Sequence, residues 1–204
     1  MAKIIMGDLF ALFNRALKKL GKNKVCLVFT ANKTVKKNGS AVMGRGFARE
    51  VRDSHMVYDH NGKVVSIHRN KESAKAALPE KGKITQSNVA QYWGDVLKNG
   101  CKTVGQASKN PMIMGFIVKR HYTEKAELFL IEHSFKMLKR YALQNPEVTF
   151  LMNYPGIGNG GRRVNEVQAI IDSSKLPDNI IIAFLPPVTK GENTKESPKC
   201  KLEK

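Results

Sequence analysis

Cysteine is scarce in this chain, and the few cysteines are far apart. Cys26, Cys101 and Cys200 are odd in number, so they predict neither a disulfide framework nor a paired-thiol metal site. A reducing, cytoplasmic location is therefore expected. The five histidines lack the spacing of metal ligands. We expect neither a metal ion nor a cofactor.

Long apolar runs are also missing. No stretch reaches the roughly 18 apolar residues of a membrane-spanning helix, and the first residues do not have the pattern of a signal peptide. No membrane partner is therefore expected. The 204 residues are 42% hydrophobic and 25% charged, and no low-complexity linker divides them. This composition predicts one well-buried domain, followed by a tail.

Acidic residues are few compared with basic ones. The chain has 17 Asp and Glu against 35 Lys and Arg, which gives a formal net charge of +18 at pH 7. Such an excess favours polyanionic partners, including nucleic acid. Because the lysines are spread along the chain, a general effect on solubility explains the charge equally well.

Strand-like and helix-like segments alternate along the chain. Four continuous apolar runs of strand length predict strands covered on both faces: residues 25–29, 112–118, 148–152 and 180–185. Between them, apolar residues recur at helical spacing, most clearly in a helix that we expect to begin after a cap at Thr123. This order predicts a three-layer α/β/α domain over residues 1–186, with a mixed, largely parallel central sheet. Ligands of such sheets bind beyond the carboxyl ends of the strands.

The middle of the chain departs from this alternation, and we interpret residues 56–110 as an insertion. Met56 to Ile67 predict a hairpin, because Asn61-Gly62 is a strong two-residue turn signal. Ser87 is suited to cap a following helix, and residues 68–83 have no informative pattern. Residues 187–204 are Lys-rich and aperiodic, which predicts a disordered basic tail.

Two glycine clusters each lie between a predicted strand and a predicted helix. The residues are Gly156-Ile157-Gly158-Asn159-Gly160-Gly161 and Met43-Gly44-Arg45-Gly46. Without side chains, their backbone N–H groups can approach phosphate oxygens. Neither cluster is a P-loop or a dinucleotide-binding fingerprint, and a tight structural turn is the alternative for each. Two such loops at one sheet edge suggest two phosphates.

A basic run, Lys119-Arg120-His121, directly follows one of the buried strands. Composition alone favours a solvated strand end. A lysine here could also act as a nucleophile toward a sugar carbonyl if its amine were partly neutral, and Arg120, Arg162 and Arg163 would lower its pKa.

With these residues in view, the chain resembles the macro domain family, particularly the branch of terminal ADP-ribose glycohydrolases and antitoxins that reverse DNA ADP-ribosylation. Five stretches carry the resemblance: Gly7-Asp8-Leu9, Thr30-Ala31-Asn32 with Val42 to Ala48, Phe116 to Tyr122, Gly156 to Gly161, and Phe184.

The resemblance implies a role for each of these residues. Asp8, beside Leu9, would contact the adenine amino group, Phe184 would stack on adenine, and Asn32 would lie near the distal ribose. The phosphates would fall to Met43, Gly44, Arg45, Gly46, Gly156, Ile157, Gly158, Asn159, Gly160 and Gly161. Lys119 would be catalytic. The implied partners are ADP-ribose and ADP-ribosylated DNA or protein.

One position departs from the branch. Where it carries an aspartate after the second glycine loop, this chain has Arg162-Arg163-Val164. Losing such an acid can cost about 10²–10⁴-fold in rate, although Glu166 is one turn away. Arg163 could instead bind an additional phosphate of the ligand. Four functions therefore stay open: a glycohydrolase, a non-catalytic reader of ADP-ribose, a phosphatase of a phosphorylated ADP-ribose, and a nucleic-acid-binding module.

Overall fold

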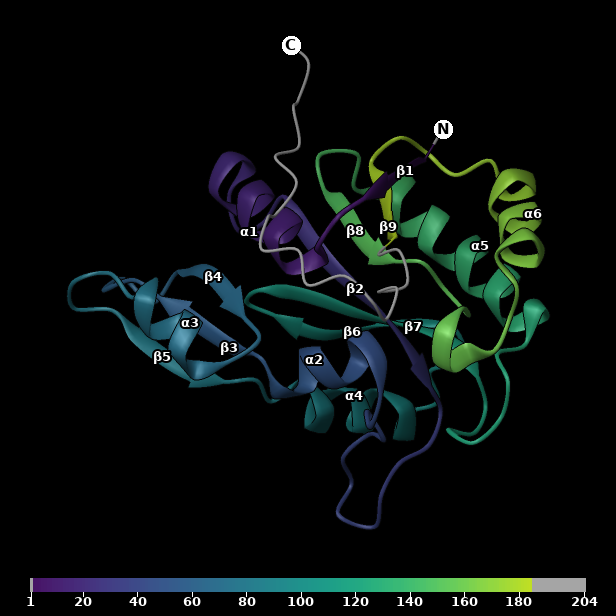
Figure 1. Ribbon diagram of the computed structural model, residues 1–204, viewed down its shortest axis with the longest axis horizontal. Helices are drawn as coiled ribbons and strands as arrows, with labels where there is room; N and C mark the ends of the chain where they lie inside the picture. Colours follow the sequence, from purple (N-terminus) through teal and green to yellow (C-terminus); the bar gives the residue numbers. More distant parts are fainter. Residues whose placement is uncertain (1, 185–204) are drawn as a thin grey trace, which may run out of the picture.

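A six-stranded sheet forms the centre of the computed structural model, which describes residues 2–184 (Figure 1). Its spatial order is β1 (Lys3–Met6), β9 (Ile180–Phe184), β8 (Thr149–Asn153), β2 (Val25–Asn32), β7 (Met112–Lys119) and β6 (Val104–Lys109). Neighbouring strands are parallel except β6, which runs antiparallel to β7. The predicted mixed, largely parallel sheet is confirmed.

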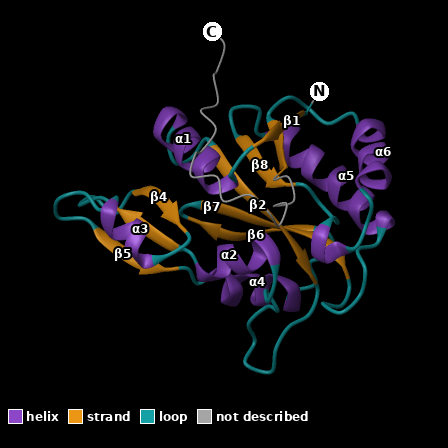
Figure 2. Ribbon diagram, in the orientation of Figure 1, coloured by secondary structure: helices purple, strands orange, loops and turns teal. Residues whose placement is uncertain are grey.

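Helices cover both faces of this sheet, as the uninterrupted apolar strands predict (Figure 2). The helices α1 (Leu9–Leu20), α2 (Gly46–Asp53) and α4 (Val89–Lys98) pack on one face, and α5 (Leu128–Gln144) and α6 (Val164–Ser174) on the other. Alternate residues of β2 enter the two cores: Leu27 and Phe29 face α1 and α4, whereas Cys26 and Val28 face α5. All four are fully buried. The result is a three-layer α/β/α architecture.

The prediction that α5 begins after Thr123 is wrong, because this helix begins at Leu128. The residues before it form a loop that is hydrogen-bonded to β7 and to the second glycine cluster, residues 156–161. The amide of Glu127 donates to Val118 O at 2.8 Å, and the amide of Ala126 donates to Gly160 O at 2.8 Å. These tertiary hydrogen bonds replace the first helical turn and bring the loop over the end of β7.

A second, three-stranded antiparallel sheet lies beside the main one, at the left of Figure 1. It contains β4 (Val64–His68), β3 (His55–Tyr58) and β5 (Lys83–Gln86), with the short helix α3 (Lys71–Ala76). The predicted hairpin is confirmed as β3 and β4, but five residues connect them rather than two. The carboxylate of Asp59 accepts hydrogen bonds from the Asn61 and Lys63 amides and shapes this longer loop. The predicted cap at Ser87 is one residue early, since Asn88 occupies the N-cap of α4.

Within residues 2–184, no helix is long and apolar enough to span a membrane. The tail predicted for residues 187–204 lies outside the described residues.

Candidate functional site

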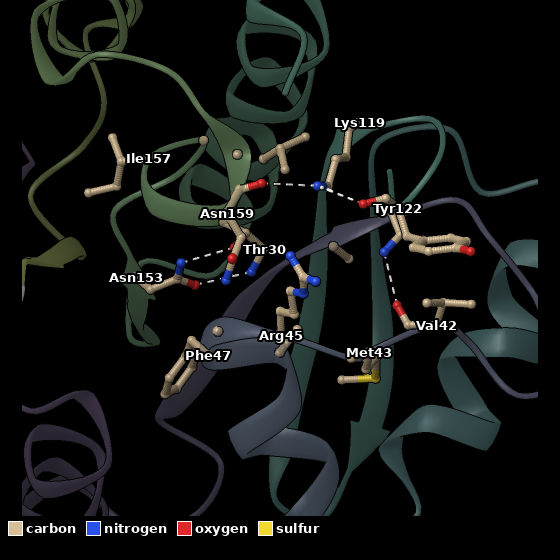
Figure 3. Close-up of a pocket in the computed structure, with 18 of the residues that line it drawn as sticks. Thr30, Val42, Met43, Arg45, Phe47, Lys119, Tyr122, Asn153, Ile157 and Asn159 are labelled. Carbon is tan, nitrogen blue, oxygen red and sulfur yellow. Dashed lines mark hydrogen bonds between the residues drawn. The ribbon is translucent and has the colours of Figure 1, made fainter. Parts of the chain in front are cut away.

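A cavity of about 540 Å³ opens at the carboxyl ends of β2, β7 and β8 (Figure 3). Its walls are the ends of these strands, a first loop that supplies residues 42–48, and a second loop, residues 156–161, of which Gly156, Ile157, Asn159 and Gly160 line the cavity, with Tyr122 and Thr123 beside them. Because β2 is parallel to both β7 and β8, three strand ends meet at one edge. This is the position at which the sequence predicts a ligand.

The first loop leaves β2 through Asn32, whose side chain fixes its course. Asn32 Nδ2 donates to Val42 O at 2.9 Å, and Asn32 Oδ1 accepts from the Thr34 amide at 2.8 Å. The loop then enters α2 at Gly46, with no side chain capping the helix start. No acceptor among residues 2–184 takes the amides of Gly46 and Phe47. These amides are therefore available to an anion at the positive end of the helix.

The second loop approaches the first. Gly158–Gly160 form one turn of 3-10 helix. A methyl group added to Gly46, which has a φ of 58°, would lie 3.0 Å from Asn159 Nδ2 of the second loop. A methyl group on Gly156 would lie 2.6 Å from Ile131 Cδ1 of α5. The positive φ of Gly46 therefore favours glycine where the two loops meet, and a positive φ together with close packing on α5 favours it at Gly156.

Lys119, the last residue of β7, lies between these loops. Its Nζ donates to three backbone carbonyls, those of Tyr122 at 3.1 Å, Glu124 at 3.0 Å and Asn159 at 3.2 Å. Two acceptors belong to the loop that replaces the first turn of α5, and the third belongs to the second glycine loop. The amine is thereby held at the cavity wall (Figure 3).

The surroundings of Lys119 lower its pKa from the ordinary value of 10.5. Partial burial is the largest cause, since it disfavours the ammonium form, and the nearby Arg45 guanidinium lowers the pKa further. Glu124 opposes both by attraction. The sequence predicts a lowered pKa but attributes it to the wrong arginines: Arg120 instead pairs with Glu127 at 3.2 Å.

Asn153, which was not predicted as a site residue, pairs with Thr30 at the cavity. Asn153 Oδ1 accepts from the Thr30 amide at 3.1 Å, and Asn153 Nδ2 donates to Thr30 Oγ1 at 3.0 Å. The pair joins the ends of β8 and β2 beneath the cavity (Figure 3). The signal for Asn153 in the sequence is its position, because Asn153 ends a buried strand as Asn32 does. Tyr122 also lines the cavity.

No carboxylate lines the cavity in the described part of the chain. Glu166, the nearest sequence candidate for the missing acid, has other partners. It accepts from the Arg163 amide at 2.8 Å, so it caps α6, and it lies 3.8 Å from Arg162 Nη1. Arg163 is the N-cap residue of α6 and does not line the cavity.

Asp8 caps α1, Leu9 is the first residue of that helix, and Phe184 ends β9; none of the three lines the cavity. The Gly7 amide donates to Phe184 O at 3.2 Å. Leu9 is buried in the core. Asp8 caps α1 by accepting from the Ala11 amide at 2.8 Å and also pairs with Arg69. Burial raises the pKa of Asp8, but the bonds from Arg69 and Ala11 outweigh it and hold the pKa below its ordinary value.

Most of the residues predicted for the ligand therefore surround one cavity. Those that line it are Asn32, Met43, Gly44, Arg45, Gly46, Lys119, Gly156, Ile157, Asn159 and Gly160. Gly158 and Gly161 belong to the second loop without lining the cavity.

Comparison with solved structures shows that the chain has the macrodomain fold. The macrodomain of Mycobacterium tuberculosis DarG matches 91% of this chain and 98% of its own length, with a TM-score of 0.52 and 20% identity. The macrodomain of Thermus aquaticus DarG matches 92% of this chain and 99% of its own, with a TM-score of 0.51 and 19% identity. Thermosipho africanus DarTG, solved in complex with ADP-ribose, matches 92% of this chain and 42% of its own, with a TM-score of 0.52 and 15% identity.

Neither a protein-family model nor a curated protein sequence matches the chain. The likeness is thus one of fold, at low sequence identity.

Proposed function

We propose that this chain binds ADP-ribose between its two glycine loops and removes it from modified DNA or protein, with Lys119 as the nucleophile. The observation that carries the proposal is the position of the Lys119 amine. It lies at the wall of a macrodomain cavity, its pKa is lowered, and it bonds to Asn159 O of the second glycine loop.

Binding is supported by the chemistry of the cavity lining. Backbone amides at the start of α2 and the Arg45 guanidinium favour the diphosphate, and no carboxylate of the lining repels it. The complex of Thermosipho africanus DarTG with ADP-ribose supports the same ligand for a chain of similar fold.

The chemical role of Lys119 requires a neutral amine. Such an amine can attack C1 of the distal ribose and displace the modified group, which takes a proton from the amine as it leaves. The ribose ring then opens, because the second amine proton passes to the ring oxygen as the C1–lysine bond becomes an imine. Water then hydrolyses the lysine adduct, releasing free ADP-ribose and restoring the amine. Burial and Arg45, which lower the pKa of Lys119, increase the neutral fraction at a given pH.

Calorimetry and hydrolysis assays on the same protein test the two halves of the proposal. We expect ADP-ribose to bind, and the wild type to release ADP-ribose from modified single-stranded DNA or glutamate-modified protein. Lys119→Ala should still bind ADP-ribose. Equal, negligible release by wild type and Lys119→Ala would exclude the catalytic half, and a folded protein that gives no heat with ADP-ribose would exclude both halves.

A non-catalytic reader of ADP-ribose is the second candidate, and two observations favour it. The three donors of the Lys119 ammonium are matched by three carbonyls, which is the arrangement of a structural cation. In addition, Glu166 caps α6 and no carboxylate lines the cavity. Calorimetric binding without turnover of any ADP-ribosylated substrate would identify a reader.

A further inference from the structure

A second cavity, of about 640 Å³, lies between the small sheet, α4 and β6. Met56, Tyr58, Thr85 and Gln86 come from β3 and β5, one side of α4 forms the facing wall, and residues 106–110 close the end. This cavity shares no lining residue with the cavity at Lys119.

Five amide side chains converge on this second cavity: Gln86, Asn88, Asn99, Gln106 and Asn110. All five are exposed, and none forms a side-chain hydrogen bond within residues 2–184, so their donors and acceptors are open to solvent or to a ligand. The amides that build the fold differ from them. The side-chain amide of Asn14, for example, donates to Ile67 O and accepts from the Ile67 amide, both at 2.8 Å.

Two tyrosines line the cavity from facing walls. Tyr58 lies on β3, and Tyr92 lies on α4 with 52% of its surface exposed. Lys83 Nζ is 5.4 Å from the centre of the Tyr58 ring, and Lys109 lies in the lining. The walls thus offer aromatic faces, amide edges and basic groups at the margin.

From this lining we infer that the second cavity binds a nucleobase, either of a free nucleoside or of a single-stranded nucleic acid. Asn and Gln amides can pair in a bidentate manner with base edges, and tyrosine rings stack on any base. Asp95 can accept from an exocyclic amino group, while Lys83 and Lys109 suit the phosphates of a strand. The inference does not depend on the proposed function, because the two cavities are separate.

The test is a titration of the full chain, saturated with ADP-ribose so that the first cavity is filled. The probes are adenosine, guanosine, cytidine and thymidine, and then ten-residue homopolymers of each deoxynucleotide. Tyr92→Ala removes one aromatic wall, and Tyr141→Ala, a partly exposed tyrosine on α5, is the matched control. If ADP-ribose does not bind, the same titrations are performed on the free protein.

We expect a nucleoside or an oligonucleotide to bind with ADP-ribose present. Loss of one stacking partner should weaken this binding at least about fivefold in Tyr92→Ala, with Tyr141→Ala unchanged. Binding of the nucleosides would identify the ligand as a free nucleoside, and binding of the homopolymers alone would identify it as a single-stranded nucleic acid. No binding by any probe, with or without ADP-ribose, or an equal loss in both variants would overturn the inference.

Discussion

At the scale of single residues, the amine of Lys119 is subject to opposing influences. Three carbonyl acceptors stabilise the ammonium, whereas burial and Arg45 stabilise the neutral amine. A nucleophilic lysine must lose both a proton and at least one of these hydrogen bonds before it can approach a sugar. Under the proposed function, the protonation of Lys119 therefore decides whether the cavity only binds its ligand or also reacts with it.

This balance predicts how activity depends on pH. If Lys119 is the nucleophile, hydrolysis should rise with pH and level off around the folded pKa of this lysine, which lies below 10.5. Arg45→Ala removes a neighbouring positive charge, so it should raise that pKa and move the rising limb to higher pH. Lys119→Ala should reduce turnover at least about 100-fold, whereas exposed Lys125→Ala should not. An unchanged profile in Arg45→Ala would contradict this account.

The contact between the two glycine loops predicts a separable effect on binding. Gly46 and Gly62 have φ values of 58° and 70°, but a methyl group on Gly62 meets nothing within 4 Å. Replacing either by alanine should cost roughly 1 kcal/mol of folding free energy through backbone strain. Only Gly46→Ala should also weaken ADP-ribose binding, by about tenfold, because Asn159 must move. Thermal unfolding and calorimetry measure the two effects, and equal affinities in both variants would argue against the loop contact.

At the scale of elements, Arg69 joins the small sheet to the macrodomain core. Following β4, it pairs with Asp8 at the start of α1 and with Glu50 of α2 at 2.7 Å. Its guanidinium also lies 5.0 Å from the centre of the Phe10 ring. One arginine thus fixes the position of three elements near the ends of β1 and β9.

A double-mutant cycle measures this link. Arg69→Met and Asp8→Asn should each destabilise the fold at neutral pH, with a coupling of about 0.5–1 kcal/mol, because both side chains are more than a third exposed. The folded pKa of Asp8 is lowered, so its stabilisation is present above the unfolded pKa near 3.9 and is lost as the pH falls through the folded pKa. Denaturant unfolding at neutral and acidic pH should show that loss. Coupling that persists at low pH would point to packing instead.

The elements predicted correctly were those whose burial is evident from a local pattern of apolar residues. The runs that became β2, β7, β8 and β9 are apolar because helices cover both of their faces. By contrast, β5 has a single apolar residue among Lys-Ile-Thr-Gln, so its composition does not predict a strand. Its backbone pairing with β3 stabilises the strand instead.

The same distinction applies to the site. Glycine clusters after strands indicated the two loops, where Gly46, Gly156 and Gly158 adopt the positive φ values that glycine tolerates best. The start of α5 was misplaced since Ala126 bonds to Gly160 O, a residue 34 positions away in the chain. The pairing of Asp8 with Arg69 likewise depends on how the small sheet packs. No local pattern encodes such contacts.

At the scale of the whole molecule, the net charge of +18 predicts that binding of a nucleic-acid strand depends more strongly on salt than binding of a small ligand. A nucleic acid releases condensed counterions when basic residues contact its phosphates. The logarithm of its binding constant therefore falls linearly with the logarithm of the salt concentration, and each contacted phosphate of a single strand adds about −0.7 to the slope. Three such contacts predict a loss of roughly 10- to 20-fold between 50 and 200 mM salt. Under the proposed function, free ADP-ribose would be held mainly by the amides of two loops, so its affinity should fall far less with salt.

Titrating the full chain with ADP-ribosylated single-stranded DNA and with free ADP-ribose over this salt range tests whether the charge serves recognition. A steep slope for the modified strand and a shallow one for the free nucleotide would show that the basic surface contacts the strand beyond the cavity. Unmodified DNA of the same sequence should give a similar slope at lower affinity, because it keeps the phosphates but lacks the ADP-ribose. If the two ligands had equal slopes, the excess of lysine would contribute nothing to substrate choice, and a protein-linked ADP-ribose would become the better substrate.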